Sequence, residues 1–129
     1  MTIWMNNDKS LIITKYNIIR QDDSNVAQIL SFLFPTECDG IDLTDFSATL
    51  FYKVPNGDTF NVILNRDEEL YKGYIRCTMP SAEDFTKYSG EVSMYVVLSK
   101  TVNEEPYTLT TSTLTIPIQS HPDYNPPTP

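Results

Sequence analysis

The clearest structural signal in this chain lies in Gly90 to Ile118, which read GEVSMYVVLSKTVNEEPYTLTTSTLTIPI. In the first part, apolar side chains recur at every second position: Val92, Met94, Val96 and Leu98. A period of two predicts a β-strand with one buried face. The second part is dense in Thr, with Tyr and Leu between, and residues 102–106 are short enough for a turn. We therefore expect the two parts to pair as a β-hairpin.

The second strand of this hairpin changes phase along its length. Tyr107 and Leu109 occupy odd positions, whereas the later apolar residues occupy even ones: Leu114, Ile116 and Ile118. One extra residue between Thr110 and Thr113 would shift the parity, so the sequence predicts a β-bulge there. Pro117 has no backbone N–H to donate to a neighbouring strand, so this end of the strand should lie at a sheet edge or carry its nitrogen toward solvent. An open edge is a surface on which a partner can dock.

Length and charge limit the classes of protein to which the chain can belong. A chain of 129 residues is large enough for one domain with its own core. The formal net charge of −8 argues against nucleic acid or an anionic membrane as the main partner, because such binding depends on clustered Lys and Arg. Met1 to Met5 lack the basic start of a secretory signal, so synthesis in a cytosol is expected. Cys38 and Cys77 are too few for a disulfide framework, and both are expected to be free thiols.

The rest of the sequence reads as short strands separated by turns. Asn56-Gly57 is a strong hairpin signal, because both residues tolerate positive φ. Residues 80–89 are the one helical candidate, with Ser81 as N-cap and Asp84 three residues later. Strands are expected at Leu11–Ile19, Val26–Phe34, Phe46–Val54, Thr59–Leu64 and Tyr71–Met79. Together these features predict an all-β, antiparallel β-sandwich of about seven to eight strands with one short helical connection.

Two terminal segments are expected to lie outside the sandwich, which covers residues 11–118. Residues 1–10 are predicted to form an N-terminal arm, in which Trp4 either folds back onto the domain or anchors in a neighbour. Residues 119–129 contain four prolines and are predicted to form an extended C-terminal arm. The candidate partner contacts in this second arm are Tyr124, Pro126 and Pro127.

Catalytic and metal sites have weak signals. The single His121 lies in the Pro-rich tail, and Ser120 beside it cannot form a catalytic triad by adjacency. Asp39, Asp42 and Asp45 recur at every third residue and offer oxygen ligands to Ca²⁺, although turn and strand-entry roles also account for them. A row of threonines either presents hydroxyls to a saccharide or simply faces solvent: Thr108, Thr110, Thr111, Thr113 and Thr115.

Four short motifs carry a resemblance to a known family. They are Tyr16-Asn17-Ile18-Ile19-Arg20-Gln21, Asp39-Gly40-Ile41-Asp42-Leu43, Tyr71-Lys72-Gly73 and Gly90-Glu91-Val92. Over residues 11–118 the chain resembles the N-terminal domain family of phage baseplate upper proteins, with the related head-fibre and minor virion proteins of phages of Gram-positive hosts. The resemblance implies an immunoglobulin-like sandwich that attaches to the particle and has no catalytic residues. Members usually continue into a coiled coil or a receptor-binding module. Here the sequence stops eleven residues after Ile118, which favours a small attachment or decoration subunit.

The resemblance implies a non-enzymatic virion protein, made in the host cytoplasm, that docks on capsid or tail and baseplate subunits. It is expected to be present in many copies or as a homo-oligomer, without a cofactor and without nucleic-acid or membrane partners. The expected partner contacts are Trp4, Tyr107 and Pro117, with Tyr124, Pro126 and Pro127 of the C-terminal arm. One alternative is a carbohydrate-binding or adhesion module on the virion surface. Another is a cytosolic regulator or inhibitor made during infection.

Overall fold

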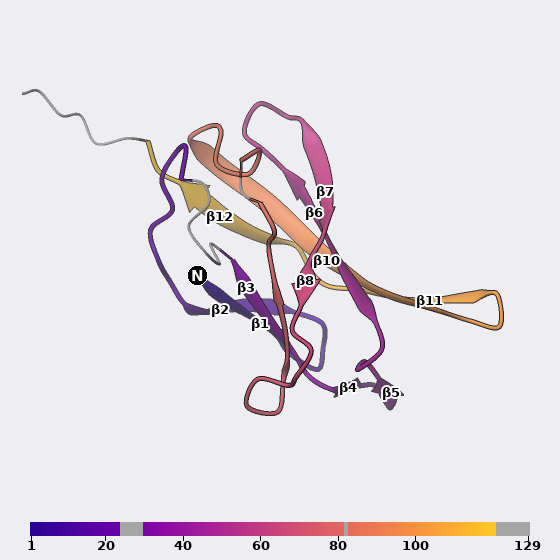
Figure 1. Ribbon diagram of the computed structural model, residues 1–129. Helices are drawn as coiled ribbons and strands as arrows, with labels where there is room; N and C mark the ends of the chain where they lie inside the picture. Colours follow the sequence, from indigo (N-terminus) through magenta and orange to yellow (C-terminus); the bar gives the residue numbers. More distant parts are fainter. Residues whose placement is uncertain (24–29, 82, 121–129) are drawn as a thin grey trace, which may run out of the picture.

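The computed structural model describes residues 1–23, 30–81 and 83–120. Within these residues the protein is all-β, with twelve strands and no helix (Figure 1). The strands are β1 (Thr2–Met5), β2 (Leu11–Lys15), β3 (Ser31–Phe34), β4 (Glu37–Cys38), β5 (Ile41–Asp42), β6 (Ser47–Lys53), β7 (Thr59–Ile63), β8 (Asn65–Arg66), β9 (Ile75–Thr78), β10 (Gly90–Val102), β11 (Glu105–Thr110) and β12 (Leu114–Ile118).

Two five-stranded sheets make up most of the fold. The first has the order β2-β1-β3-β9-β8, in which only the β1·β3 pair is parallel. The second has the order β11-β10-β6-β7, with β12 also paired to β10, and all its pairs are antiparallel. The short β4 and β5 form a separate hairpin. This architecture is consistent with a β-sandwich, and it has more strands than the seven or eight expected.

One hydrophobic core is built from alternate residues of both sheets. In β6 the burial alternates along the strand, so that Ala48, Leu50 and Tyr52 point inward, as the sequence predicted. β10 shows the same alternation, and the predicted inner face of Val92, Met94, Val96 and Leu98 is confirmed. The first sheet supplies further side chains with none of their surface exposed, namely Ile3, Phe32 and Phe34.

β10 is the longest strand and has neighbours along both edges. It pairs with β6 on one side, while β12 and then β11 share the other side. Val97 faces Thr110 and Met94 faces Leu114, so three steps along β10 correspond to four steps on the opposite side. The predicted hairpin and the predicted one-residue slip are both confirmed.

Thr111 occupies this slip and supplies hydrogen bonds that the interrupted ladder would otherwise lack. The backbone N–H of Val96 donates to Thr111 Oγ1 (2.9 Å), and the Thr111 N–H donates to the Val96 carbonyl (3.0 Å). Thr111 is buried, whereas Thr110, Thr113 and their Thr neighbours on the strands are exposed. The predicted row of threonine hydroxyls is therefore broken at its centre by a residue with a structural role.

The prediction of an N-terminal arm at residues 1–10 is corrected by the structure. Thr2–Met5 form β1, which lies between β2 and β3 inside the first sheet. Met1, Ile3 and Met5 are buried at alternate positions, which is the period of a strand with one face on the core. Trp4 therefore folds back onto the domain, on the outer face of a central strand.

The helical connection expected at residues 80–89 is also corrected. The described residues of this segment form turns and bends. Phe85 and Thr86 are buried as neighbours, and Thr86 Oγ1 donates to the Asp23 carbonyl at 2.6 Å. A helix would bury positions three or four apart, but Tyr88 is exposed here. The segment packs as a loop held by its contact with the chain near Asp23.

Several strand boundaries also differ from those expected. β2 ends at Lys15 and β9 begins only at Ile75. The described part of the Val26–Phe34 prediction contains β3, and residues 24–29 lie outside the described residues. The Asn56-Gly57 hairpin between β6 and β7 is present, but only Gly57 has a positive φ, at 95°.

Replacing Thr111 with Val tests the hydrogen bonds at the bulge. The substitution keeps the shape of the side chain but removes the acceptor for the buried Val96 N–H. We expect the free energy of unfolding in chemical denaturation to fall by about 1–3 kcal/mol. Thr110→Val, at the neighbouring exposed position, should change it by less than about 0.5 kcal/mol. Equal effects of the two substitutions would contradict this role for Thr111.

Candidate functional site

The β10–β11 hairpin extends beyond the sheet to which it belongs. β6 pairs with β10 only as far as Ser99, whereas β11 continues to pair with β10 up to Val102. Figure 1 shows this two-stranded ribbon reaching away from both sheets. Val102 and Tyr107 are 37% and 46% exposed on it, and Lys100 Nζ lies 3.5 Å from Asp45 Oδ2 at its base. The hairpin therefore presents an aliphatic and an aromatic side chain to the outside.

The tip of this hairpin is a two-residue turn with an unusual composition. Asn103 and Glu104 have φ values of 51° and 65°, so both central residues are left-handed. Turns of this kind favour Asn-Gly, because glycine has no Cβ to clash with the following carbonyl. Glu104 stands where glycine is preferred, at the tip of the projecting hairpin.

Two strands share one edge of the second sheet, and β7 forms the opposite edge. In the described residues β11 and β12 each have β10 as their only strand neighbour. Pro117 of β12 is exposed, which agrees with the predicted edge position. Just beyond it, Gln119 bridges to Arg20, so this end of the edge is partly covered by the chain. The freer part of the edge is Tyr107–Thr110, since Pro106 lacks an N–H to donate.

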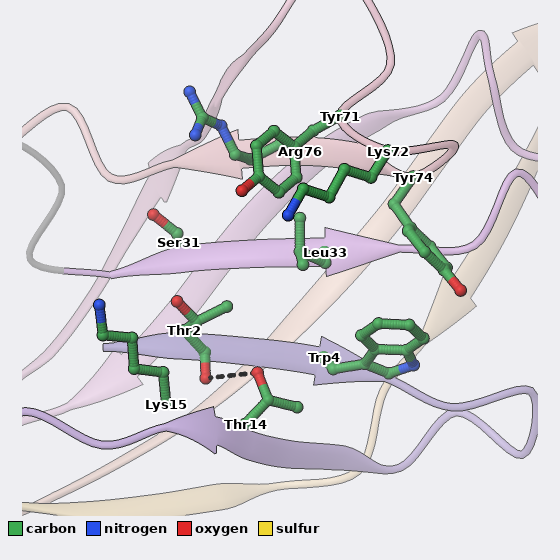
Figure 2. Close-up of a pocket in the computed structure, with 10 residues that line it drawn as sticks. All are labelled: Thr2, Trp4, Thr14, Lys15, Ser31, Leu33, Tyr71, Lys72, Tyr74 and Arg76. Atoms are coloured by element: carbon green, nitrogen blue, oxygen red, sulfur yellow. Dashed lines mark hydrogen bonds between the residues drawn. The ribbon is translucent and has the colours of Figure 1, made fainter.

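A groove of about 390 Å³ lies on the outer face of the first sheet. Its floor comes from β1, β2, β3 and β9, and the turn at Tyr71–Tyr74 forms one wall (Figure 2). The Tyr71 and Tyr74 N–H groups donate to each other's carbonyls at 2.8 and 2.9 Å, and Lys72 and Gly73 between them have positive φ. Trp4 stands at the far end beside Tyr74, with ring centroids 4.3 Å apart.

Three basic residues line the same groove, and one of them is neutralised. Arg76 Nε lies 2.7 Å from Asp67 Oδ2, and its guanidinium lies 5.0 Å from the centre of the Tyr71 ring. Lys72, the residue next to Tyr71 in the turn, places its Nζ 5.4 Å from the centre of the same ring. Among the described residues, neither Lys72 nor Lys15 forms an ion pair. The groove thus combines aromatic rings with two uncompensated positive charges.

A β-bulge directs Lys15 into this groove. Ile3 pairs with Ile13, but Thr2 pairs with Lys15, so Thr14 is an extra residue on β2. By simple alternation Lys15 would share the inward face of Leu11 and Ile13. The bulge turns it outward to the face of Thr2 and Trp4, where Figure 2 shows its ammonium group at the opposite end of the groove from Trp4.

The two cysteines are buried, free and unsuited to nucleophilic chemistry. Burial raises the pKa of the Cys77 thiol to about 12. Burial also raises the pKa of Cys38, with the Asp39 carboxylate adding to the shift, and Cys38 Sγ donates to the Asn7 carbonyl at 3.3 Å. A reactive cysteine needs a lowered pKa and access to solvent, so neither thiol is poised as a nucleophile.

The three aspartates considered for Ca²⁺ have separate roles. Asp39 faces Lys9 at 3.7 Å, Asp45 faces Lys100, and Asp42 accepts hydrogen bonds from the Thr44 N–H and hydroxyl, which lower its pKa. Within the described ranges, no group of three or more His, Cys, Asp or Glu side chains is placed to hold a metal ion. The structure gives the Ca²⁺ hypothesis no support.

The predicted partner-binding residues do not form one site. Trp4 lies in the groove of the first sheet, whereas Tyr107 and Pro117 lie on the open edge of the second. Residues 121–129, with the predicted contacts Tyr124, Pro126 and Pro127 and with His121, lie outside the described residues.

Sequence reasoning did not pick out Lys15, Lys72 or Tyr74 as members of a site. Lys72-Gly73 flanked by two tyrosines is a recognisable turn signal, and it locates the wall of the groove. The bulge that reorients Lys15 has no comparable sequence signal. β2 is short, and an inserted Thr14 does not visibly interrupt its alternation of apolar and polar residues.

Comparison with known proteins adds no family. No protein-family model matches the chain, and neither does any curated protein. Among the residues that the structure describes, no helix is long and apolar enough to cross a membrane. The function therefore has to be inferred from the hairpin and the groove.

Thiol labelling tests the burial of the cysteines. Because a pKa of about 12 leaves almost no thiolate at neutral pH, Cys77 in a Cys38→Ala variant should resist an aromatic disulfide reagent in the native protein and react readily in concentrated guanidinium. Absorbance of the released thiolate measures both rates. Equal rates in the two conditions would contradict the burial of Cys77.

Replacing Glu104 with Gly tests the strain at the hairpin tip. We expect the free energy of unfolding to rise by about 0.5–1 kcal/mol, because glycine removes the cost of a left-handed Cβ. Glu105→Gly makes the same chemical change at the first residue of β11. It should lower the free energy of unfolding by about 0.5–1 kcal/mol, and a loss of stability in both variants would argue against strain at Glu104.

Proposed function

We propose that this chain is a non-enzymatic structural protein of a tailed-phage virion, which docks on capsid or tail and baseplate subunits as an attachment, fibre-anchoring or decoration subunit. The observation that carries the proposal is the projecting β10–β11 hairpin. It extends past its own sheet and exposes Val102 and Tyr107. Aromatic anchors of this kind supply much of the binding energy at protein interfaces.

The places of the family-like motifs support the same proposal. Asp39-Gly40 and Lys72-Gly73 each form a two-residue turn in which both residues have positive φ. Turns with two positive φ values favour a small set of residues such as Gly, Asn and Asp. Motifs at these turns are therefore expected to recur in proteins that share the fold. An immunoglobulin-like topology for the sandwich is part of this proposal.

Docking would use the hairpin in one of two ways. Tyr107–Thr110 offer a short length of open strand for pairing with a partner's strand. The tip and Tyr107 can instead insert as a unit into a groove between partner subunits. In either mode a weak single contact becomes strong when many copies bind one particle, because the repeated sites act together.

A carbohydrate-binding or adhesion module is the second candidate function. The groove on the first sheet favours it, since Trp4 and Tyr74 place aromatic rings beside hydroxyl and ammonium groups. This groove and the hairpin belong to different sheets, so the two functions are separable by mutation.

Mass spectrometry of gradient-purified particles tests the first function. The chain should be present in a fixed ratio to the major capsid protein, and its absence from clean particles would overturn the virion proposal. A cytosolic regulator would be found in infected cells and not in particles.

A variant in the hairpin tests how the protein docks. Val102→Ala with Tyr107→Ala should lower the ratio in particles at least about fivefold, the loss expected for an interface anchor. Tyr16→Ala removes a tyrosine of similar exposure, 49%, outside the hairpin and should leave the ratio unchanged. Equal incorporation of the wild type and the hairpin variant would overturn docking through the hairpin.

A further inference from the structure

The groove on the first sheet concentrates positive charge in an acidic protein. The chain has 9 Lys and Arg against 17 Asp and Glu, yet three of the basic residues line this one groove. Arg76 is paired with Asp67, and the other two, Lys15 and Lys72, have no carboxylate within ion-pair distance among the described residues. A ligand with a negative charge would therefore find two free ammonium groups there.

Both of these lysines are placed by special backbone features. The bulge at Thr14 turns Lys15 to the outer face, and the two-residue turn holds Lys72 with a φ of 50°. Figure 2 shows the Lys72 ammonium extending from the turn over Leu33, between the Trp4 and Lys15 ends of the groove. Both lysines are exposed, and Figure 2 shows their ammonium groups at separate points along the length of the groove.

The rings of Trp4 and Tyr74 occupy the end of the groove opposite Lys15 (Figure 2). Trp4 and Tyr74 pack at 4.3 Å with an angle of 57° between their planes, and both stay partly exposed. The negative faces of such rings attract the polarised C–H groups on one side of a sugar ring. Thr2 and Thr14 add hydroxyl groups between the rings and Lys15. The volume of about 390 Å³ falls in the range of about 300–1,000 Å³ found for small-ligand sites.

We propose that this groove binds an acidic saccharide, with a sugar ring against Trp4 and Tyr74 and its anionic group between Lys72 and Lys15. The inference rests on the second function proposed above and names its ligand class. The anion is a carboxylate of a uronic acid or a phosphate on a sugar, because an ammonium group binds either as a point charge.

An acidic peptide fits this groove less well. Extended peptides gain affinity by pairing their backbone with the open edge of a sheet. The groove lies on the face of the sheet instead, over β1 and β3, whose backbone groups are already paired on both sides. A peptide would have to bind there through side chains alone, whereas a sugar ring matches the ring, hydroxyl and ammonium groups directly.

An array of saccharides with the full chain as probe is the first test. It should carry uronate-bearing glycans, phosphate-bearing glycans and the methyl-esterified or dephosphorylated form of each. We expect retention of one acidic set above its neutral form, and that set identifies the anion. Equal retention of acidic and neutral forms would leave a carbohydrate-binding module but overturn the proposed ligand class. No retention of any saccharide would overturn both the inference and the second function.

Variants then assign the binding to the groove by titration calorimetry with the retained glycan. Lys15→Gln and Lys72→Gln should each weaken binding up to about fivefold, as for partly exposed charge pairs, and more strongly at low salt. Trp4→Leu should weaken it at least about tenfold, as expected for an aromatic anchor. Lys87→Gln makes the same charge change at an exposed lysine outside the groove and should have no effect.

Two further results would overturn the proposal. Lys87→Gln weakening binding as much as Lys72→Gln would show a general charge effect. Poly-glutamate competing with the glycan as strongly as the free glycan does would assign the groove to an acidic peptide. Because Trp4 lies in a central strand, circular dichroism of Trp4→Leu confirms folding, and the two exposed lysine variants test the groove without that risk.

Discussion

The pairing of β10 along both its edges is the constraint on which the rest of the structure depends. This strand joins β6 on one side and both β11 and β12 on the other. β11 and β12 can pair in succession with one edge of β10 only if the residues between them still satisfy the backbone groups of β10. Thr111 satisfies those of Val96 through two hydrogen bonds. The bulge keeps Leu109 and Ile116 on the same buried face despite their opposite parity.

Each of the two large sheets contains one irregularity of the same kind, a single inserted residue. In the second sheet, the slip at Thr111 lets β11 and β12 pair in succession with the same edge of β10. In the first sheet, the bulge at Thr14 rotates Lys15 out of the inward-facing series and beside Trp4. In the first sheet, one inserted residue thus adds an ammonium group to the groove. The core beneath both features stays continuous.

Much of the fold could be predicted from the sequence wherever alternation was long. β6 and β10 have seven and thirteen residues, and their buried faces follow directly from the pattern. β1 has four residues, and its buried Ile3 and Met5 were too few to stand out from a polar segment. The segment at residues 80–89 had helix-like end signals, but a long-range bond from Thr86 to Asp23 decided its conformation. Such a contact has no trace in local sequence.

The candidate site was harder to predict than the core. Tyr107 and Pro117 were accessible to reasoning because edge position and composition are local properties. The groove depends on five elements that meet only after folding, namely β1, β2, β3, β9 and the turn before β9. Trp4 is the single tryptophan of the sequence, but its neighbour Tyr74 lies seventy positions later in the chain. No regular spacing in the sequence predicts a contact between side chains that are so far apart in the chain.

The central place of β1 also bears on how the chain folds. β1 is made first, yet its parallel partner β3 begins at Ser31, and β3 in turn pairs with β9, which begins at Ile75. The first sheet therefore closes only after Ile75–Thr78 have been synthesised. Non-local pairing of this kind slows folding relative to helical proteins. Until β9 arrives, the nascent chain carries the unpaired edge of β3, a state that favours association with other chains.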